Sequence, residues 1–317
     1  MGPRLQHRRP ADPDADEQGG RQVRPALHGT QGLNTTATSA NATSSRPLRA
    51  WRTLRTALHL VQGVLTIALV FPFCRKDTQL TLRQRWSQRL LGILGIRLQV
   101  EGPPVAPGCL LVANHISWVD IFVINALAPS AFVSKAEVRD WPVAGWLAAR
   151  SDTVFLRRGS RGHAKIVNAE IAALLDAGRN VAVFPEGTTT DGSHVLHFHA
   201  ALLQPAIAAG HAVQPLALSY HLFDGTPTSA PAYVGDISLG ACFSATIGER
   251  TIIARVQAAA AIDTTVMTDR RTVARETHDH IARAIRSEKL RPHSGEFSLA
   301  STLADEETTQ ACKPSPP

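Results

Sequence analysis

Val112–Asp120 reads VANHISWVD, an apolar run that leads into a histidine and, five residues later, an aspartate. The apolar residues Leu110–Ala113 predict a buried strand, and a helical pattern follows the motif. Residues five apart on an ideal helix are rotated by about 140°, so His115 and Asp120 can meet only if His115 lies in the turn before the helix. Asp120 would then fix the tautomer of His115 and leave its other ring nitrogen free to take a proton. The spacing alone is more typical of a structural histidine beside an N-capping Asn114.

A second stretch, VFPEGTTTDG (Val183–Gly192), also ends an apolar run. Its Pro-Glu-Gly predicts a tight turn that carries one carboxylate, Glu186, and exposed backbone N–H groups. Such a turn can bind a hydroxyl, a phosphate or a developing oxyanion. Taken alone it is also typical of an ordinary strand-to-loop turn, since Pro and Gly are common turn residues.

Short apolar runs alternate with helical patterns through the rest of the chain. The runs predict strands at residues 109–113, 131–134, 153–156, 180–184 and 213–219. The helical patterns lie at residues 118–127, 143–150, 163–177, 199–209 and 268–289. This alternation predicts one α/β domain, residues 99–290, built on a largely buried sheet that helices flank.

The most apolar stretch is Ala57–Phe73, ALHLVQGVLTIALVFPF, with basic residues on both flanks. About 17–25 apolar residues can span a bilayer, so we expect a spanning or re-entrant membrane segment; a buried core helix is the alternative. Leu80–Leu98 has the pattern of a basic amphipathic helix at an anionic membrane surface or of an ordinary surface helix. Residues 46–98 are therefore expected to associate with a membrane. The polar ends, 1–45 and 291–317, are expected to be disordered.

The chain is basic, with a net charge of +7, which indicates an anionic partner. No run of basic residues is interleaved with aromatic ones as in a nucleic-acid groove, so we expect membrane lipids and no nucleic acid. The four cysteines form no Cys-x-x-Cys pair, which argues against a zinc site or a disulfide framework. His194, His197 and His199 match no metal-binding spacing, and no metal site is expected.

Together, Asn-His-x4-Asp at Asn114–Asp120 and Phe-Pro-Glu-Gly-Thr at Phe184–Thr188 resemble motifs of the membrane-bound glycerolipid acyltransferases, the lysophospholipid acyltransferase family. Two weaker blocks match in order. They are Thr153–Arg158, TVFLRR, with Asp152 where the family usually has glycine, and Val213–Ala217, VQPLA.

The resemblance covers about residues 49–289 and implies the glycerolipid acyltransferase fold, a mixed sheet flanked by helices with an N-terminal membrane helix. It implies that His115 acts as general base on a lysolipid hydroxyl and that Asp120 orients it. The alkoxide would attack the thioester of acyl-carrier protein or acyl-CoA directly, with no acyl-enzyme, metal or further cofactor. Arg158 and the turn Glu186–Gly187 would hold the polar head of the acceptor. The family also implies the bacterial inner membrane, with the active site facing the cytoplasm.

Thr189 departs from the family pattern. Phosphatidate-forming members usually have arginine there, and a threonine hydroxyl cannot form the bidentate charged pair that arginine makes with phosphate. The sequence Gly-Thr-Thr-x-Asp-Gly resembles the lyso-ornithine lipid acyltransferase branch, whose acceptor has an amino-acid head. On this interpretation Thr188, Thr189 and Asp191 contact the head group, and Asp191 meets its amine. Lysophosphatidate is the alternative acceptor, because Arg158 remains.

Two other classes of protein fit parts of the pattern. A lipid-binding or scaffolding membrane protein could keep the fold without turnover, and its function would not depend on His115. A hydrolase could use His115 to activate water against thioesters and would release fatty acid without an acceptor. Nucleic-acid binding would need a helix-turn-helix or RNA-binding motif, and the sequence has none.

Overall fold

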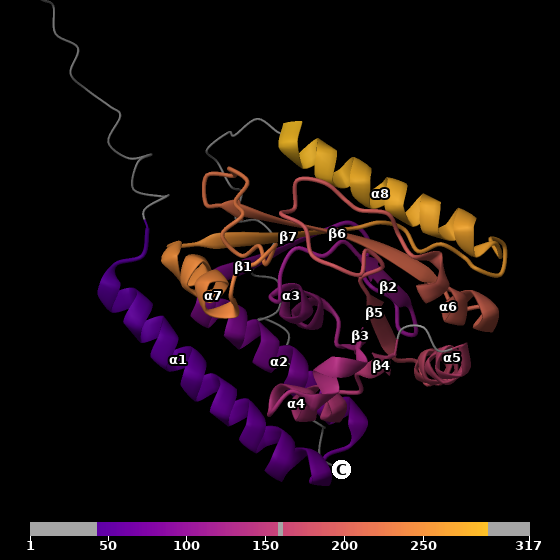
Figure 1. Cartoon of the computed structure of the whole chain (residues 1–317), viewed down its shortest axis with the longest axis horizontal. Coiled ribbons are helices and arrows are strands. Elements are labelled where there is room, and N and C mark those ends of the chain that lie inside the picture. Colours follow the sequence, from indigo (N-terminus) through magenta and orange to yellow (C-terminus); the bar gives the residue numbers. More distant parts are fainter. Residues whose placement is uncertain (1–42, 158–160, 291–317) are drawn as a thin grey trace, which may run out of the picture. The chain divides into compact units, whose positions relative to one another are not determined.

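A mixed β-sheet lies at the centre of the fold (Figure 1). The computed structural model describes residues 43–157 and 161–290. In spatial order the strands of this part are β1 (Ile96–Glu101), β7 (Ile252–Ala258), β6 (Val213–Leu222), β2 (Leu110–Ala113), β5 (Asn180–Val183), β3 (Ser130–Lys135) and β4 (Val154–Leu156). β6 and β7 pair antiparallel, and the other neighbours pair parallel.

β2 lies between β6 and β5, and its four residues are fully buried. A strand covered on both faces needs apolar residues throughout, which explains the uninterrupted run LLVA. The parallel pairing of β2, β5, β3 and β4 brings their carboxyl ends to one edge of the sheet. The segments that follow β2 and β5, which carry the two main motifs, therefore meet at that edge.

Helices cover both faces of the sheet. One face carries α2 (Lys76–Leu94), α3 (Asp120–Leu127) and α7 (Leu239–Gly248). The other carries α5 (Arg161–Asp176), α6 (Gln204–Ala209) and α8 (Arg270–Leu290). The short α4 (Ala144–Arg150) lies between β3 and β4 in the chain. The predicted α/β class and the mixed, mostly buried sheet flanked by helices are confirmed.

The N-terminal helix α1 (Arg46–Leu65) continues into a π-helical turn, Thr66–Val70, and a 3₁₀ turn, Phe71–Phe73. Its inner side packs on α2. The ring of His59 stacks on Trp86 with the centroids 4.5 Å apart, and Trp86 Nε1 donates to the His59 carbonyl at 3.2 Å. His59 thus joins two helices, which explains a histidine inside the most apolar stretch of the chain.

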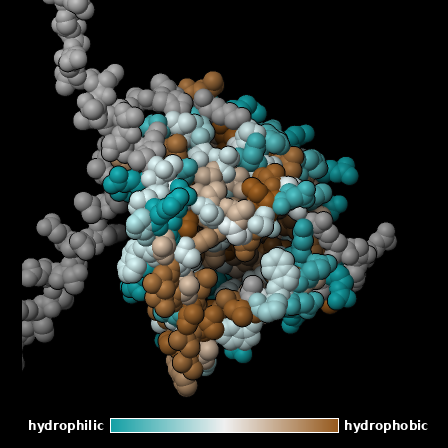
Figure 2. Space-filling model, turned by 60° about the vertical axis from the view of Figure 1, so that its left-hand side comes forward, coloured by the Kyte–Doolittle hydropathy of each residue, from teal (hydrophilic) through white to brown (hydrophobic). Residues whose placement is uncertain are grey.

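The outer side of α1 is apolar and exposed. Leu58, Leu65, Leu69 and Phe73 have exposed fractions of 61%, 51%, 64% and 88%. Figure 2 shows hydrophobic surface gathered at the lower end of the view, the level at which α1 ends in Figure 1. Arg46–Phe73 is long and apolar enough to cross a bilayer, and only 17% of its most apolar window is buried. This exposure argues against the buried core helix and favours the predicted membrane association.

The structure differs from the sequence prediction where α2 ends. A helix was expected over Leu80–Leu98, and Leu98 lies at helical spacing from Leu94. Gly95 instead takes a left-handed conformation (φ 82°) that ends the helix, and β1 begins at Ile96. β1 therefore crosses the domain boundary expected between residues 98 and 99.

Further elements were not predicted at all. They are α7 and β7. β7 lies in the core although it includes a charged residue, Arg255. That guanidinium is buried and pairs with Glu288 of α8, so the charge is compensated inside the fold. Of the ends expected to be disordered, residues 1–42 and 291–317 lie outside the described residues.

Candidate active site

His115 and Asp120 meet at the carboxyl edge of the sheet. His115 lies in the turn after β2, and Asp120 is the first residue of α3. Nδ1 of His115 lies 2.8 Å from Oδ2 of Asp120, the contact that the spacing allows only in this arrangement. Because a carboxylate accepts, Nδ1 carries the proton and Nε2 has the free lone pair. The His115 side chain is 21% exposed, so Nε2 is the atom at which a proton could be taken up.

The carboxylate of Asp120 is fully buried and heavily hydrogen-bonded. Besides the His115 contact, Oδ2 accepts from the backbone N–H groups of Ile116 and Ser117 at 2.7 and 2.9 Å. Oδ1 accepts from the hydroxyl of Tyr220 on β6 at 2.6 Å. No motif in the sequence pointed to Tyr220. It lies 100 residues away along the chain, and only the register of β6 on β2 brings it to this carboxylate.

The turn after β5 packs directly against His115. The ring of Phe184 stacks on the imidazole with centroids 4.0 Å apart and planes 12° from parallel. Gly187 has a φ of 71°, a left-handed conformation that glycine adopts without strain. Phe184 therefore covers one face of the imidazole, and Gly187 allows the tight turn that follows Phe184.

Glu186 lies in this turn, but its carboxylate faces the protein. Oε1 accepts the backbone N–H of His115 and Oε2 that of Leu196, both at 2.8 Å. The residue is 5% exposed. Burial raises the pKa of the Glu186 carboxyl, and the N–H bonds from Leu196 and His115 partly offset that effect. The resemblance implied that Glu186 holds the acceptor, whereas this geometry favours a role in fixing the backbone at His115.

The loop after Gly187 closes over the turn that holds His115. The backbone N–H of Thr190 donates to the His115 carbonyl at 2.8 Å. Thr188 is exposed, and the hydroxyl of Thr189 donates to the carbonyl of Tyr233. Asp191 is about half exposed, and its Oδ1 accepts the N–H of Ser193 at 2.8 Å. Thr188, Thr189 and Asp191 therefore flank Thr190, which bonds this loop to the turn of His115.

Arg158 lies outside the described residues, so its predicted contact with the acceptor stays a prediction. The residue that departs from the glycine of this block is described. Asp152 has a φ of 60°, the conformation for which glycine is the usual choice. Its carboxylate pairs with Lys76, Arg83 and Arg179 at 3.2, 3.0 and 2.7 Å. Burial works to raise the pKa of Asp152, but Arg179 and Arg83 outweigh it and hold the pKa at about 2.

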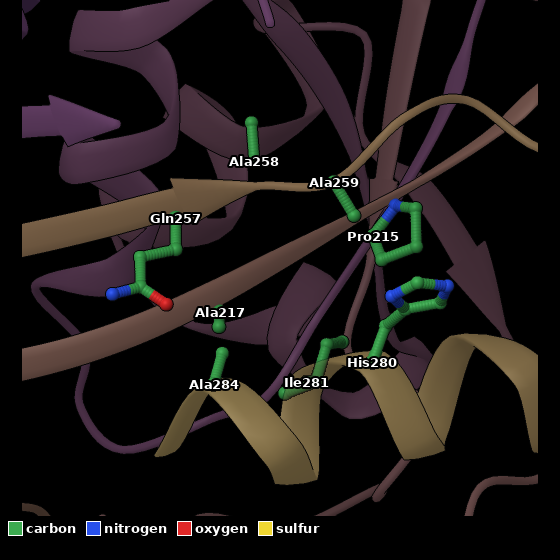
Figure 3. A pocket seen from close by; sticks show the side chains of 8 residues that line it. All are labelled: Pro215, Ala217, Gln257, Ala258, Ala259, His280, Ile281 and Ala284. Carbon is green, nitrogen blue, oxygen red and sulfur yellow. The ribbon is translucent and has the colours of Figure 1, made fainter. Parts of the chain in front are cut away.

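The described residues contain no cluster of three or more side chains suited to a metal ion. Two shallow cavities lie away from His115. One, of about 130 Å³, lies under α8, where Pro215 and Ala217 of β6 face His280 and Ile281 (Figure 3). The other, of about 290 Å³, lies at the amino ends of β3 and β5 and includes Pro129 and Arg179.

Comparison with known proteins agrees with this geometry. An acyltransferase family model matches residues 97–219. A lyso-ornithine lipid O-acyltransferase of Pseudomonas aeruginosa is 48% identical over 162 residues, which are 50% of this chain and 62% of that protein. A second lyso-ornithine lipid O-acyltransferase, from Brucella abortus, is 34% identical over 67% of this chain and 87% of its own length.

Relatives with a different named acceptor are also similar. A 1-acyl-sn-glycerol-3-phosphate acyltransferase of Neisseria meningitidis is 38% identical over 57% of this chain and 71% of that protein. The crystal structure of a 1-acyl-sn-glycerophosphate acyltransferase from Thermotoga maritima shares the fold, with a TM-score of 0.55 and 22% identity over 76% of this chain and 98% of that one. The motifs, the sheet and these relatives agree, and the chain belongs to the lysophospholipid acyltransferase family.

Proposed function

We propose that the protein transfers a fatty acyl group from a thioester to the free hydroxyl of a lysolipid, with lyso-ornithine lipid as the acceptor. The observation that carries the reaction is the His115–Asp120 pair, with Nδ1 bound to Asp120 at 2.8 Å and the ring partly exposed. Nε2 takes the proton of the acceptor hydroxyl as its oxygen attacks the thioester carbonyl. The carbon–sulfur bond then breaks, and the leaving thiolate takes the proton back from Nε2. Each atom and charge is accounted for without an acyl-enzyme.

Thr189 supports the choice of acceptor. Its hydroxyl is engaged with the Tyr233 carbonyl, so the side chain offers a phosphate neither a charge nor an uncommitted donor. Asp191, in the same loop and about half exposed, supplies a negative charge suited to the amine of an ornithine head. Relatives named as lyso-ornithine lipid O-acyltransferases agree with this choice. Arg158 remains a candidate for contact with the acceptor in either case.

Lysophosphatidate is the second candidate acceptor. The Neisseria relative, named as a 1-acyl-sn-glycerol-3-phosphate acyltransferase and 38% identical, favours it. The donor in both cases is acyl-carrier protein or acyl-CoA. The exposed apolar side of α1 supports attachment to the bacterial inner membrane. Because these thioesters are made in the cytoplasm, the site would face that side.

An acceptor panel tests this proposal. Membranes that carry the full chain, or its His115→Ala variant, receive lyso-ornithine lipid or lysophosphatidate with a labelled acyl thioester of each donor type. We expect the wild type to acylate lyso-ornithine lipid and the variant to lose about 10²–10⁴-fold in rate, the usual contribution of a general base. Acylation of lysophosphatidate alone would overturn the ornithine assignment. Release of fatty acid without any acceptor would identify a hydrolase. Absence of transfer to either acceptor would favour a lipid-binding protein, and full transfer by His115→Ala would show that His115 is not the base.

A further inference from the structure

Tyr220 lies outside the sequence motifs, and the length of β6 determines its position. β6 is longer than its neighbour β2: Leu216 pairs with Ala113, the last residue of β2, and Tyr220 lies four residues beyond. Side chains alternate along a strand. Figure 3 shows Pro215 and Ala217 facing α8, so Leu216, Leu218 and Tyr220 face the opposite side, toward α3. The extra length of β6 therefore brings the hydroxyl level with the turn that holds His115.

The hydroxyl of Tyr220 completes the hydrogen bonding of Asp120. Three donors reach Oδ2: Nδ1 of His115 and the N–H groups of Ile116 and Ser117. Within the described residues, Tyr220 is the one donor to Oδ1, at 2.6 Å. A fully buried carboxylate oxygen without a donor is costly. Without Tyr220 only Oδ2 would be held, so the carboxylate could tilt about that oxygen and its alignment with the imidazole would weaken.

The hydroxyl also stays protonated over the working pH range. Burial raises the pKa of Tyr220 well above its usual value, and the negative charge of Asp120 adds to this. Tyr220 is thus a permanent donor. Two other titratable groups lie near Asp120 and His115. Glu186 accepts from the His115 backbone. Cys242 of α7 lies near Asp120 and Tyr220, and its thiol donates to the Pro231 carbonyl at 3.2 Å.

We propose that Tyr220 is a positioning residue of the transfer reaction: it holds Oδ1 of Asp120 and so keeps Oδ2 directed at Nδ1 of His115. This inference rests on the proposed function of His115 as general base. By withdrawing part of the negative charge of Asp120, the hydroxyl also sets how strongly the carboxylate favours the protonated imidazole. Tyr220 acts only through Asp120 and touches no substrate.

The first test replaces Tyr220 by phenylalanine in the full-length, membrane-bound protein. We expect kcat to fall by about tenfold to a hundredfold, the effect of one hydrogen bond to a charged group, while KM for donor and acceptor stays constant. The acid limb of the pH–rate profile should move to higher pH, because Asp120 then attracts the protonated imidazole more strongly. Thr277→Val is the matched control, because it removes another fully buried hydroxyl, on α8 behind the other face of the sheet, and should change neither kcat nor the profile.

A double substitution separates positioning from packing. If Tyr220 acts through Asp120, adding Tyr220→Phe to Asp120→Asn should cost little more than Asp120→Asn alone. Additive losses would mean that the hydroxyl acts independently of Asp120, and they would contradict the proposal, as would an unchanged kcat and profile in Tyr220→Phe. If the wild type transfers to no acceptor, the proposed function itself has failed, which is a separate outcome.

A second variant guards against misfolding of the phenylalanine form. The chain has two tyrosines, so a Tyr233→Phe background labelled with fluorinated tyrosine alters Tyr220 alone and keeps its shape. A more acidic hydroxyl is a stronger donor, so the acid limb should move to lower pH than in the unlabelled background, opposite to the shift in Tyr220→Phe. A limb that does not move, or moves to higher pH, would contradict the proposal.

Discussion

Asp120 and Asp152 are both carboxylates held by several hydrogen bonds, but the donors differ in kind. Asp120 is fully buried, and apart from His115 its donors are neutral: two backbone N–H groups and one hydroxyl. The Asp152 side chain is 20% exposed, and three cationic side chains surround it. One carboxylate therefore lies in a neutral shell and the other in a positive one.

The difference decides what each charge can do. Neutral donors stabilise a negative charge without cancelling it, so the charge of Asp120 still acts on His115. Cations cancel the charge of Asp152, which then joins α2 to the segments that precede β4 and β5. Substitution of Asp120 should accordingly change the rate of reaction, and substitution of Asp152 should change the stability of the fold.

The largest effect is expected for Asp120→Asn. The amide keeps the shape of the carboxylate but carries no charge, and its NH₂ group cannot accept from the donors that Asp120 serves. We expect kcat per folded molecule to fall by about 10²–10⁴-fold, measured as acyl transfer by membranes with matched amounts of protein. A thermal unfolding scan of the same samples is the control. If the loss of activity merely followed a loss of folded protein, Asp120 would be structural, as Asp152 is.

Asp152→Asn should show the reverse pattern. Asparagine tolerates the left-handed backbone, so the substitution removes the charge and leaves the conformation. The pKa of Asp152 is lowered from 3.8 to about 2, so its ionisation stabilises the fold by about 2 kcal/mol. We expect this loss in denaturant unfolding at neutral pH, with nearly normal activity per folded molecule.

The pH dependence of that loss has a definite sign. Because the pKa of Asp152 is lower in the folded protein, its stabilisation is present above pH 3.8 and disappears as the pH falls through about 2. Unfolding curves of wild type and Asp152→Asn should therefore converge toward pH 2. Asp152→Gly, which restores the usual family residue, removes the same charge together with any backbone strain. A gap that is undiminished near pH 2 would show that the charge is not its source.

Some features of the site could be predicted from the sequence, and others could not. His115 and Asp120 are five residues apart, so the sequence defined the one arrangement in which they can meet, and the resemblance of the paired motifs assigned their role. Glu186 was identified but its surroundings were not, because two backbone N–H groups, one of them 71 residues away, determine which way the carboxylate faces. Tyr220 depends on the length and register of β6, and neither leaves a local signal.

The fold shows the same limit. β2 and β5 were predicted because both faces of each are buried, which forces continuous apolar runs. β1 was hidden because Leu98 continues the helical leucine spacing, and only Gly95 marks the break. β7 was missed because Arg255 interrupts its apolar character, and its partner Glu288 is 33 residues away on α8. Interactions between distant segments decide these cases.

Glu186 is a second carboxylate with neutral donors, and Glu186→Gln tests whether they matter for the reaction. Glutamine has one acceptor oxygen for the two N–H groups that Glu186 binds, so the backbone of His115 should loosen. We expect kcat to fall about tenfold, equivalent to one weakened hydrogen bond, with KM for the acceptor unchanged. Exposed Glu170 offers a matched control, since Glu170→Gln should have no effect. A selective rise in the acceptor KM would instead support the acceptor contact that the family resemblance implies.

The smallest effect on stability is expected for Lys76, the exposed member of the three cations around Asp152. Lys76 is 59% exposed and pairs with Asp152 at 3.2 Å, whereas Arg83 is buried and also donates to the Ser130 carbonyl. Exposed ion pairs contribute little, so Lys76→Ala should lower the free energy of unfolding by less than about 0.5 kcal/mol. High salt should abolish even that difference, because solvent ions screen an exposed pair. A loss as large as that of Asp152→Asn would mean that the carboxylate needs all three cations, and that its stabilising effect comes from total charge more than from the two arginine contacts.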